Sequence, residues 1–308
     1  MKRPTFRGSH VRRTSGVTAL VLALLAPLAG CGSSAAGDGA DAGPTVSKVD
    51  AIAALIPESL RSRGVLRVAV PDGSPPLASV DDSGAVVGMD PSLARALGGL
   101  MGLKVKLTAG SFDSQVPGLQ SGKFDLAMGE YYVTADRLKS ADFVSDWRDY
   151  SSFATRSADG WKPAGGQDLC GKKIGVMKGS AEEASVTTFN RKCSTPMTIS
   201  SFPDQSASFL ALNSSRIDAV VTGRGQLETA ASTTKGFKIS GEFGGGPCAT
   251  AVARNGDSAK MLKAVQAGYA ELIKSGTYLQ ILKKWNSDYG ALDKPQIYTA
   301  DSTPPKYS

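Results

Sequence analysis

The chain has 308 residues, and its 35 Lys and Arg side chains exceed its 28 Asp and Glu side chains, which gives a formal net charge of +7. Five basic residues and no acidic residue lie in the first 30 positions, so the remainder is almost neutral, with 30 basic against 28 acidic residues, and its charge indicates no nucleic-acid partner. The only histidine, His10, also lies there, which excludes Ser-His and Cys-His catalysis and most zinc sites from the remainder.

Residues 1–30 predict a secretory signal peptide. A basic start precedes an apolar run over residues 17–28, which is shorter than the roughly 20 residues that span a bilayer. Leu28-Ala29-Gly30-Cys31 then resembles the bacterial lipobox, in which the cysteine receives a diacylglyceryl group and becomes the mature N-terminus. We therefore expect lipidation of Cys31, and an ordinary signal peptide with a chance cysteine is the alternative. Arg12-Arg13 leaves the twin-arginine route open beside the general export route.

Residues 31–48 predict a flexible tether, because Gly, Ser, Ala and Asp dominate them and offer almost nothing to bury. Folding should begin near Val49. About 278 residues follow the signal peptide, which is enough for two modest lobes.

Strand and helix patterns alternate through the next hundred residues. The expected elements are a helix over 51–56, a strand over 66–70, a helix from Asp90 (as N-cap) to Gly102, a strand over 105–107, a helix over 116–120, a strand over 124–128 and a helical turn over 135–139 capped by Thr134. Such alternation favours an α/β fold with a parallel sheet.

The same alternation restarts after Phe153. The expected elements are strands over 173–177, 197–199, 219–221 and 249–253, and helices over 181–189, 206–212 and 258–275. The last helix has a continuous apolar face, so we expect it to pack on a core.

An ordered set of short motifs extends over residues 49–285. They include Gly64–Val70, Val87–Asp90, Phe112-Asp113, Ser121–Asp125, Val133–Arg137, Asp168–Gly171, Lys178–Ser180, Ser215–Ala219, Ser275–Tyr278 and Lys284-Trp285. In this order they resemble the bacterial extracellular solute-binding proteins of family 3, the polar amino-acid group of ABC importers, and most closely the actinobacterial members.

The resemblance implies an α/β, two-lobed periplasmic-binding-protein-like fold of type II, with two hinge strands and the ligand in the interlobe cleft. Lobe 1 would span 49–155 and return over 253–289, lobe 2 would span 156–252, and 290–308 would form a C-terminal tail. The crossings should lie near Phe153 and Val252.

The resemblance also implies the partners. We expect a monomeric extracytoplasmic lipoprotein, anchored to the cell membrane by the lipid on Cys31, that binds a small carboxylated polar solute, an amino acid or derivative, and delivers it to an ABC permease. We expect no catalytic residue, metal or cofactor.

Arg137 is the first expected ligand-binding residue. Family members hold the ligand α-carboxylate with this arginine, and a guanidinium pairs with a carboxylate through two parallel hydrogen bonds. Lys178-Gly179-Ser180 precedes a helix, and Ser180 with Glu183 fits a capping box. The resemblance implies that backbone N–H groups of Gly179 and Ser180 bind the same carboxylate.

Three further side chains are expected at the cleft. Phe112 stands where the family often has an aromatic residue beside the ligand, with plain core packing as the alternative. Tyr131 and Tyr132 face opposite sides of a strand, and Tyr132 is the expected cleft residue. Glu130 stands where relatives usually have a small residue.

Gly223 limits the identification of the ligand. Relatives that bind α-amino acids usually have an aspartate at this position, which pairs with the ligand amino group. Either Glu130 supplies the missing negative charge, or the ligand lacks an ordinary α-ammonium group, because a buried ammonium without a charged partner is costly.

Three cysteines follow Cys31. We expect Cys170 and Cys193 to form a disulfide, since oxidation is permitted outside the membrane, with free buried thiols as the alternative. Cys248 has no assigned role.

Two other functions stay open. One is an enzyme on the same fold, similar to secreted cyclohexadienyl dehydratases, for which only Glu130 could transfer a proton. The other is a ligand-sensing lipoprotein without a permease.

Overall fold

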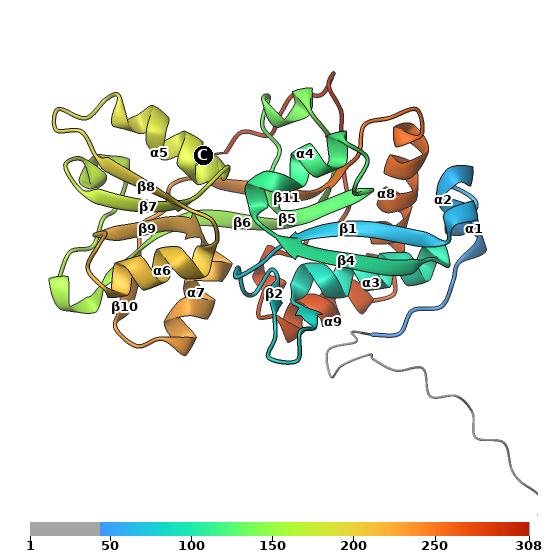
Figure 1. Ribbon diagram of the computed structural model, residues 1–308, viewed down its shortest axis with the longest axis horizontal. Coiled ribbons are helices and arrows are strands. Elements are labelled where there is room, and N and C mark those ends of the chain that lie inside the picture. The colour runs from blue at the N-terminus through green and yellow to red at the C-terminus, as the bar shows by residue number, and fades with distance from the viewer. Residues whose placement is uncertain (1–43, 308) are drawn as a thin grey trace, which may run out of the picture. The chain divides into compact units, whose positions relative to one another are not determined.

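The computed structural model describes residues 44–307, which form the two lobes in Figure 1. The expected signal peptide, Cys31 and the tether up to residue 43 lie outside the described residues. None of the helices within 44–307 is long and apolar enough to cross a bilayer.

Lobe 1 contains most of the described elements. They are α1 (Asp50–Ala53), α2 (Glu58–Arg63), β1 (Val65–Pro71), β2 (Ser79–Val80), β3 (Val86–Val87), α3 (Met89–Met101), β4 (Lys104–Gly110), η1 (Phe112–Ser114), α4 (Gln115–Gln120), β5 (Leu126–Tyr132), η2 (Arg137–Lys139), β11 (Gly245–Val252), α8 (Ser258–Lys274), α9 (Thr277–Lys284), η5 (Asp288–Gly290) and β12 (Ile297–Tyr298).

Lobe 2 is smaller. It contains η3 (Ser157–Asp159), η4 (Gly166–Leu169), β7 (Lys173–Met177), α5 (Ala181–Asn190), β8 (Thr198–Phe202), α6 (Gln205–Asn213), β9 (Ala219–Gly223), α7 (Arg224–Thr233) and β10 (Phe237–Ser240), and β6 (Asp142–Arg156) belongs to both lobes.

One mixed sheet runs through both lobes in the order β4-β1-β5-β11-β6-β9-β7-β8. Strands β4, β1 and β5 are parallel, as are β8, β7 and β9, whereas β11 and β6 run antiparallel to their neighbours. In lobe 1, α3, α8 and α9 cover one face and α4 covers the other; in lobe 2, α5 lies opposite α6 and α7 (Figure 1). The fold is the two-lobed α/β architecture that the motifs imply.

The leucines of α3 explain its place in the lobe 1 core. Leu93, Leu97 and Leu100 lie on one face and are buried, and Gly102 ends the helix at a left-handed φ of 69°. The predicted start was wrong, because Gly88, at φ 138°, is the N-cap and Asp90 lies inside the first turn.

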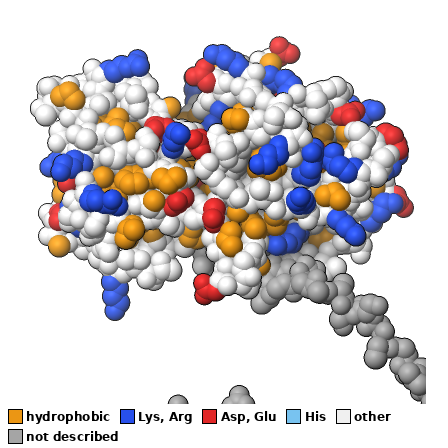
Figure 2. Space-filling view, viewed as in Figure 1, with side chains coloured by type: hydrophobic (Ala, Val, Ile, Leu, Met, Phe, Trp, Pro, Cys, Tyr) orange, Lys and Arg blue, Asp and Glu red, His pale blue; other side chains and the backbone are white. Residues whose placement is uncertain are grey.

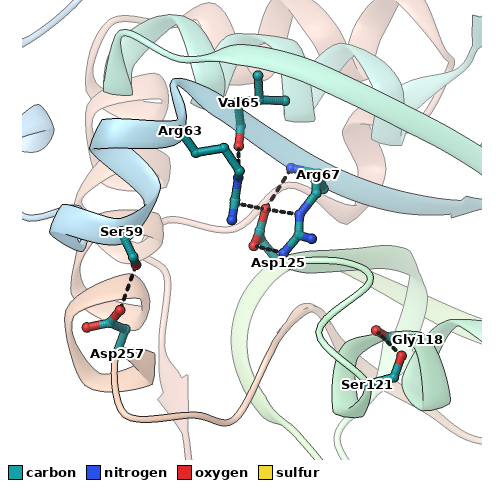
Figure 3. A network of polar contacts seen from close by, with 8 residues as sticks. All are labelled: Ser59, Arg63, Val65, Arg67, Gly118, Ser121, Asp125 and Asp257. Carbon is teal, nitrogen blue, oxygen red and sulfur yellow. Dashed lines mark hydrogen bonds and ion pairs between the residues drawn. The ribbon is translucent and has the colours of Figure 1, made fainter.

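Asp125 ties the start of β1 to the turn before β5. Its carboxylate accepts hydrogen bonds from Arg63 and from Arg67, whose backbone N lies 2.8 Å from Oδ2 and whose Nη2 lies 2.8 Å from Oδ1 (Figure 3). Burial alone would raise the pKa of Asp125, but the hydrogen bonds and charges of the two arginines outweigh it and lower the pKa. This network fixes the strand that leads to the cleft.

The hinge consists of β6 and β11. Strand β6 pairs with β11 over its first half and with β9 and β10 over its second half, so it crosses between the lobes near Ser151. The return crossing lies at Gly244-Gly245 and not near Val252, because Val252 already pairs with Asp142 and Leu126 inside the lobe 1 sheet. The glycines before Pro247 interrupt the apolar pattern, so the sequence did not predict the first half of β11.

Two other features bear on the predictions. Cys170 and Cys193 form the expected disulfide, with Cα atoms 5.4 Å apart, and Cys248 is a buried free thiol. Part of the expected C-terminal tail joins the sheet, because β12 pairs with β6 at Phe143 and Val144.

Candidate functional site

The candidate site lies where the ends of β5, β7 and β9 meet between the lobes. A small cavity there is lined by Phe112, Gly129, Glu130, Arg137, Met177, Ser180, Ala181, Glu182, Thr222 and Gln226. The cavity measures about 10 Å³, which suffices for roughly one water molecule.

The lobes touch each other around this cavity. Ser206 of lobe 2 donates from its backbone N to the carbonyl oxygen of Gly73 at 2.9 Å, and Lys178 Nζ lies 2.9 Å from Asp113 Oδ2. The structure is therefore closed, and a ligand of amino-acid size enters only when the lobes separate about the hinge.

Arg137 joins the two lobes inside the site. Its Nη1 donates to the carbonyl oxygen of Tyr132 at 2.9 Å, and its Nη2 donates to that of Gly179, in lobe 2, at 3.1 Å. The guanidinium carbon lies 5.5 Å from the ring centroid of Phe112 and 5.1 Å from that of Tyr131. Burial lowers the pKa of Arg137, because it removes water from the charged guanidinium. An anionic ligand group would therefore stabilise the charged form of this side chain.

The turn between β7 and α5 has the expected helix cap in altered form. The hydroxyl of Ser180 accepts from the backbone N of Glu183 at 3.0 Å, as predicted. The carboxylate of Glu183, however, accepts from Gly179 N at 2.7 Å rather than from Ser180 N, which donates to the carbonyl of Met177. Both N–H groups expected to meet a carboxylate therefore already have acceptors in this closed form.

The aromatic residues divide between the two sides of β5. Tyr131 stacks on Phe112 with ring centroids 4.6 Å apart, and both rings flank Arg137. Tyr132 faces the opposite side of the strand, where its hydroxyl is buried without a hydrogen-bond partner among the described residues. Phe112 thus lines the small cavity, whereas Tyr132 lines a second one.

Glu130 meets a second carboxyl group. Asp149, which is fully buried on β6, lies against it, accepts from Tyr289 Oη at 2.8 Å and accepts from the backbone N of Gly225 at 3.2 Å. Burial, reinforced by the charge of Asp149, raises the pKa of Glu130, and burial raises the pKa of Asp149 to about 6. Both carboxyl groups therefore bind a proton more readily than they would in water.

Glu182 is the third carboxyl group of the site. It occupies the first turn of α5, is more than nine-tenths buried, and accepts from the hydroxyl of Ser151 at 2.6 Å. The described residues contain no group of three or more His, Cys, Asp or Glu side chains arranged to hold a metal ion.

The pair of Glu130 and Asp149 fills the space that a side chain at Gly223 would need. A Cβ on Gly223 would lie 2.6 Å from Asp149 Oδ2 and would also collide with the Glu130 carboxyl group. The carboxyl groups of Glu130 and Asp149 therefore occupy the space beside position 223.

A second, larger cavity of about 390 Å³ adjoins the site. It shares Ala181 and Glu182 with the small cavity, and Tyr132, Phe189, Phe243 and Tyr307 give it aromatic walls. Its volume lies in the range of ligand pockets.

Sequence reasoning missed Asp149, Glu182 and Tyr307. The sequence could have identified Glu182, because this acid lies two residues after the predicted helix cap Ser180, in the helix turn that faces the cleft. Asp149 left none, since it lies in a polar stretch of β6 without a motif. Tyr307 lies in a segment that the motifs do not reach.

Comparisons with known proteins agree with this geometry. The sequence model of the bacterial extracellular solute-binding proteins, family 3, matches residues 66–288. The arginine-binding protein ArgT of Corynebacterium glutamicum is 27% identical over 256 residues, which cover 81% of this chain and 83% of that protein.

Solved structures give the same result. An ancestral arginine-binding protein bound to arginine matches with a TM-score of 0.67 and 33% identity, over 72% of this chain and 98% of that one. The ancestral amino acid-binding protein AncCDT-1, a precursor of cyclohexadienyl dehydratase, matches with a TM-score of 0.67 and 28% identity, over 74% of this chain and 98% of that one. The chain therefore belongs to the bacterial extracellular solute-binding proteins of family 3.

Proposed function

We propose that the protein binds a cationic amino acid or a close derivative and delivers it to an ABC permease. The observation that carries this proposal is the charge of the site, where Glu130 and Glu182 line the cavity together with a single guanidinium, that of Arg137, and Asp149 lies against Glu130. A ligand with one carboxylate and two cationic groups complements this set. The arginine-binding relatives support the same ligand class.

The ligand would be held from both sides of the cleft. Its α-carboxylate pairs with Arg137, which exchanges the carbonyl oxygens of Tyr132 and Gly179 for the carboxylate. Its α-ammonium lies against Glu130 and Asp149, which replace the aspartate that is absent at Gly223. Figure 2 supports a cation at the cleft, because Asp and Glu side chains lie along the boundary of the lobes while many Lys and Arg side chains spread over lobe 1.

Calorimetric titration of residues 44–308 with amino acids of different charge tests the proposal. L-arginine and L-lysine should bind, L-glutamine should bind more weakly, and L-glutamate should not bind, since the three carboxyl groups repel a second carboxylate. Tighter binding of L-glutamate than of L-arginine would reject the proposal.

The delivery role includes attachment to the cell. Residues 1–30 direct export, the lipid on Cys31 anchors the protein to the membrane, and residues 31–48 tether a monomeric binding unit that can reach the permease. Replacing Cys31 with Ser should release the protein into the medium or leave it unprocessed. A Cys31→Ser protein that stays processed and membrane-bound would reject the anchor.

A dehydratase activity is the second candidate, because burial and the charge of Asp149 raise the pKa of Glu130, which favours its acid form, and AncCDT-1 has a similar fold. Prephenate and arogenate each have two carboxylates, which the acidic site disfavours, so binding without turnover is the expected function. Incubation with each compound, followed by absorbance of the aromatic product, distinguishes the two.

A further inference from the structure

The larger cavity has a wall that lies outside the family-matched region. Tyr307 lines it, and this residue lies 19 positions beyond residue 288, where the family match ends. The motifs of the family therefore assign no role to this side chain.

Tyr307 is held firmly in its place. Its hydroxyl accepts a hydrogen bond from the backbone N of Val133 and donates to the carbonyl of Pro247 at 3.1 Å. Its ring packs edge-on against Tyr132, with centroids 4.8 Å apart. Gly246 leaves room for the ring, since a Cβ there would approach it to 2.7 Å. These contacts join the C-terminal segment to the ends of β5 and β11.

The chemistry of the cavity combines aromatic rings with one buried acid. Phe189 and Phe243 form a pair in lobe 2, with centroids 6.0 Å apart, on the opposite side from Tyr132 and Tyr307. Glu182 lines both cavities, and the exposed Lys192 also lines the larger one. Aromatic rings near an acid favour a cation with an apolar body.

The unpartnered hydroxyl of Tyr132 also indicates a ligand. This side chain is more than nine-tenths buried, and its oxygen has no hydrogen-bond partner among the described residues. Buried polar groups without partners are uncommon and costly, so a ligand group that hydrogen-bonds this oxygen would offset the cost.

We propose that Tyr307 contacts the ligand and that the larger cavity receives a ligand side chain that is both cationic and bulky, preferably aromatic. The proposal rests on the proposed function, because the α-carboxylate and α-ammonium remain at Arg137 and at the Glu130–Asp149 pair. The side chain then extends past Glu182, which holds its cation, and lies between the lobe 2 phenylalanines and Tyr307.

Three L-amino acids distinguish the contribution of the cation from that of the aromatic ring in the ligand side chain. L-lysine has a cation without a ring, L-phenylalanine has a ring without a cation, and Nε-benzyl-L-lysine has both, with its ammonium between the α-carbon and the ring. By calorimetric titration, the third should bind about tenfold tighter than either of the others. Tyr307→Ala should remove most of this advantage and leave the affinity for L-lysine within about threefold.

Lys306→Ala is the matched control, since this exposed neighbour lies on the same segment outside the cavity lining and should change nothing. If thermal unfolding shows that Tyr307→Ala disturbs the fold, the Tyr307→Leu variant is measured instead, because leucine keeps a large apolar side chain without the ring. This variant shows whether the ring of Tyr307 causes the tighter binding of the aromatic ligand. Retention of the aromatic advantage in that variant overturns the proposal.

The outcomes also separate this inference from the proposed function. Binding of L-lysine and the aromatic cation with equal affinity, unaffected by Tyr307→Ala, overturns the role of Tyr307 and leaves the cationic-ligand function intact. Absence of binding of every cationic amino acid by the unmodified protein contradicts both.

Discussion

At the scale of single residues, the site depends on Arg137, whose guanidinium has hydrogen-bond acceptors in both lobes of the closed form. Arg137 donates to two carbonyl oxygens and lies between two rings, so its guanidinium keeps one orientation in the closed form. A carboxylate that replaces those carbonyls meets a positioned charge and gains a charge-assisted hydrogen bond pair.

Replacing Arg137 with Ala should weaken binding of the cationic amino acid by about 2–5 kcal/mol, because one partner of a largely buried charge pair is lost. The measurement is calorimetric titration, with thermal unfolding to verify the fold. Lys178→Ala is the control, since this cation lies near the cleft but pairs with Asp113 at the surface and should cost little. Equal losses in the two variants would contradict the assigned role.

The Glu130–Asp149 pair predicts a pH-dependent affinity. Both pKa values are raised, so we expect the pair to bind a proton that an arriving cation displaces. Affinity should therefore fall as pH decreases through about 6, where Asp149 also becomes protonated. Titrations in buffers of different ionisation enthalpy should detect proton release on binding at pH 7.

Glu130→Gln should abolish that proton release, because the amide cannot share a carboxyl proton with Asp149. Asp136→Asn removes an exposed acid next to Arg137 and should leave proton release unchanged. Proton release that persists in Glu130→Gln would show that another group is responsible.

At the scale of helices and strands, the regular apolar elements were predictable and the polar ones were not. Helix α3 and strand β7 followed from spaced leucines and a short apolar run, and their bounds differ little from the prediction. The sequence did not predict the 15-residue strand β6, because the buried residues Asp142, Asp146 and Asp149 interrupt its hydrophobic pattern.

The same reasoning explains which site residues could be found. Arg137, Phe112 and Ser180 lie in motifs at the ends of regular elements, where a local pattern identifies them. Asp149 reaches the site through the pairing of β6 with β11, and Tyr307 through contacts with residues about 60 and 174 positions away. Such long-range placement leaves no local pattern in a single sequence.

The corner between β9 and α7 gives an element-scale prediction. Gly223→Ala should weaken ligand binding, because the added methyl group displaces the Glu130 and Asp149 carboxyl groups, while the backbone accepts it at a φ of −58°. Titration of the variant with L-arginine measures the effect. Gly165→Ala, where a Cβ meets nothing within 4 Å, serves as the control.

The disulfide supports a different part of lobe 2. Replacing both Cys170 and Cys193 with Ser should lower the free energy of unfolding by about 3 kcal/mol, as expected for a loop closed over 23 positions. Denaturant unfolding measures the loss, and the affinity of the folded protein should not change, since neither cysteine lines the site cavities. An unchanged denaturation midpoint would contradict a stabilising role.

At the scale of the whole molecule, the protein contains several carboxyl groups whose pKa burial raises. Burial and the charge of Asp146 raise the pKa of Asp90, and burial raises the pKa of Asp146 to about 7. Together with Glu130 and Asp149, they make the ligand-free folded state bind more protons than the unfolded state in weakly acidic solution.

Stability without ligand should therefore increase as pH falls from about 8 to about 5. Each proton held only by the folded state contributes about 1.4 kcal/mol per pH unit between its unfolded and folded pKa values. Denaturant unfolding across this range measures the slope, and Asp146→Asn should reduce it. A free energy of unfolding that rises with pH across the same range would contradict the raised pKa values.

The position of Tyr307 also has a practical side for anyone who produces this protein. A purification tag or fluorescent partner joined directly after residue 308 would begin two residues after Tyr307, which lines the larger cavity beside the strands of the hinge. Such a fusion could report altered affinity that belongs to the tag. Attachment before residue 44 keeps added sequence away from that wall, so assays of ligand specificity should compare the two arrangements.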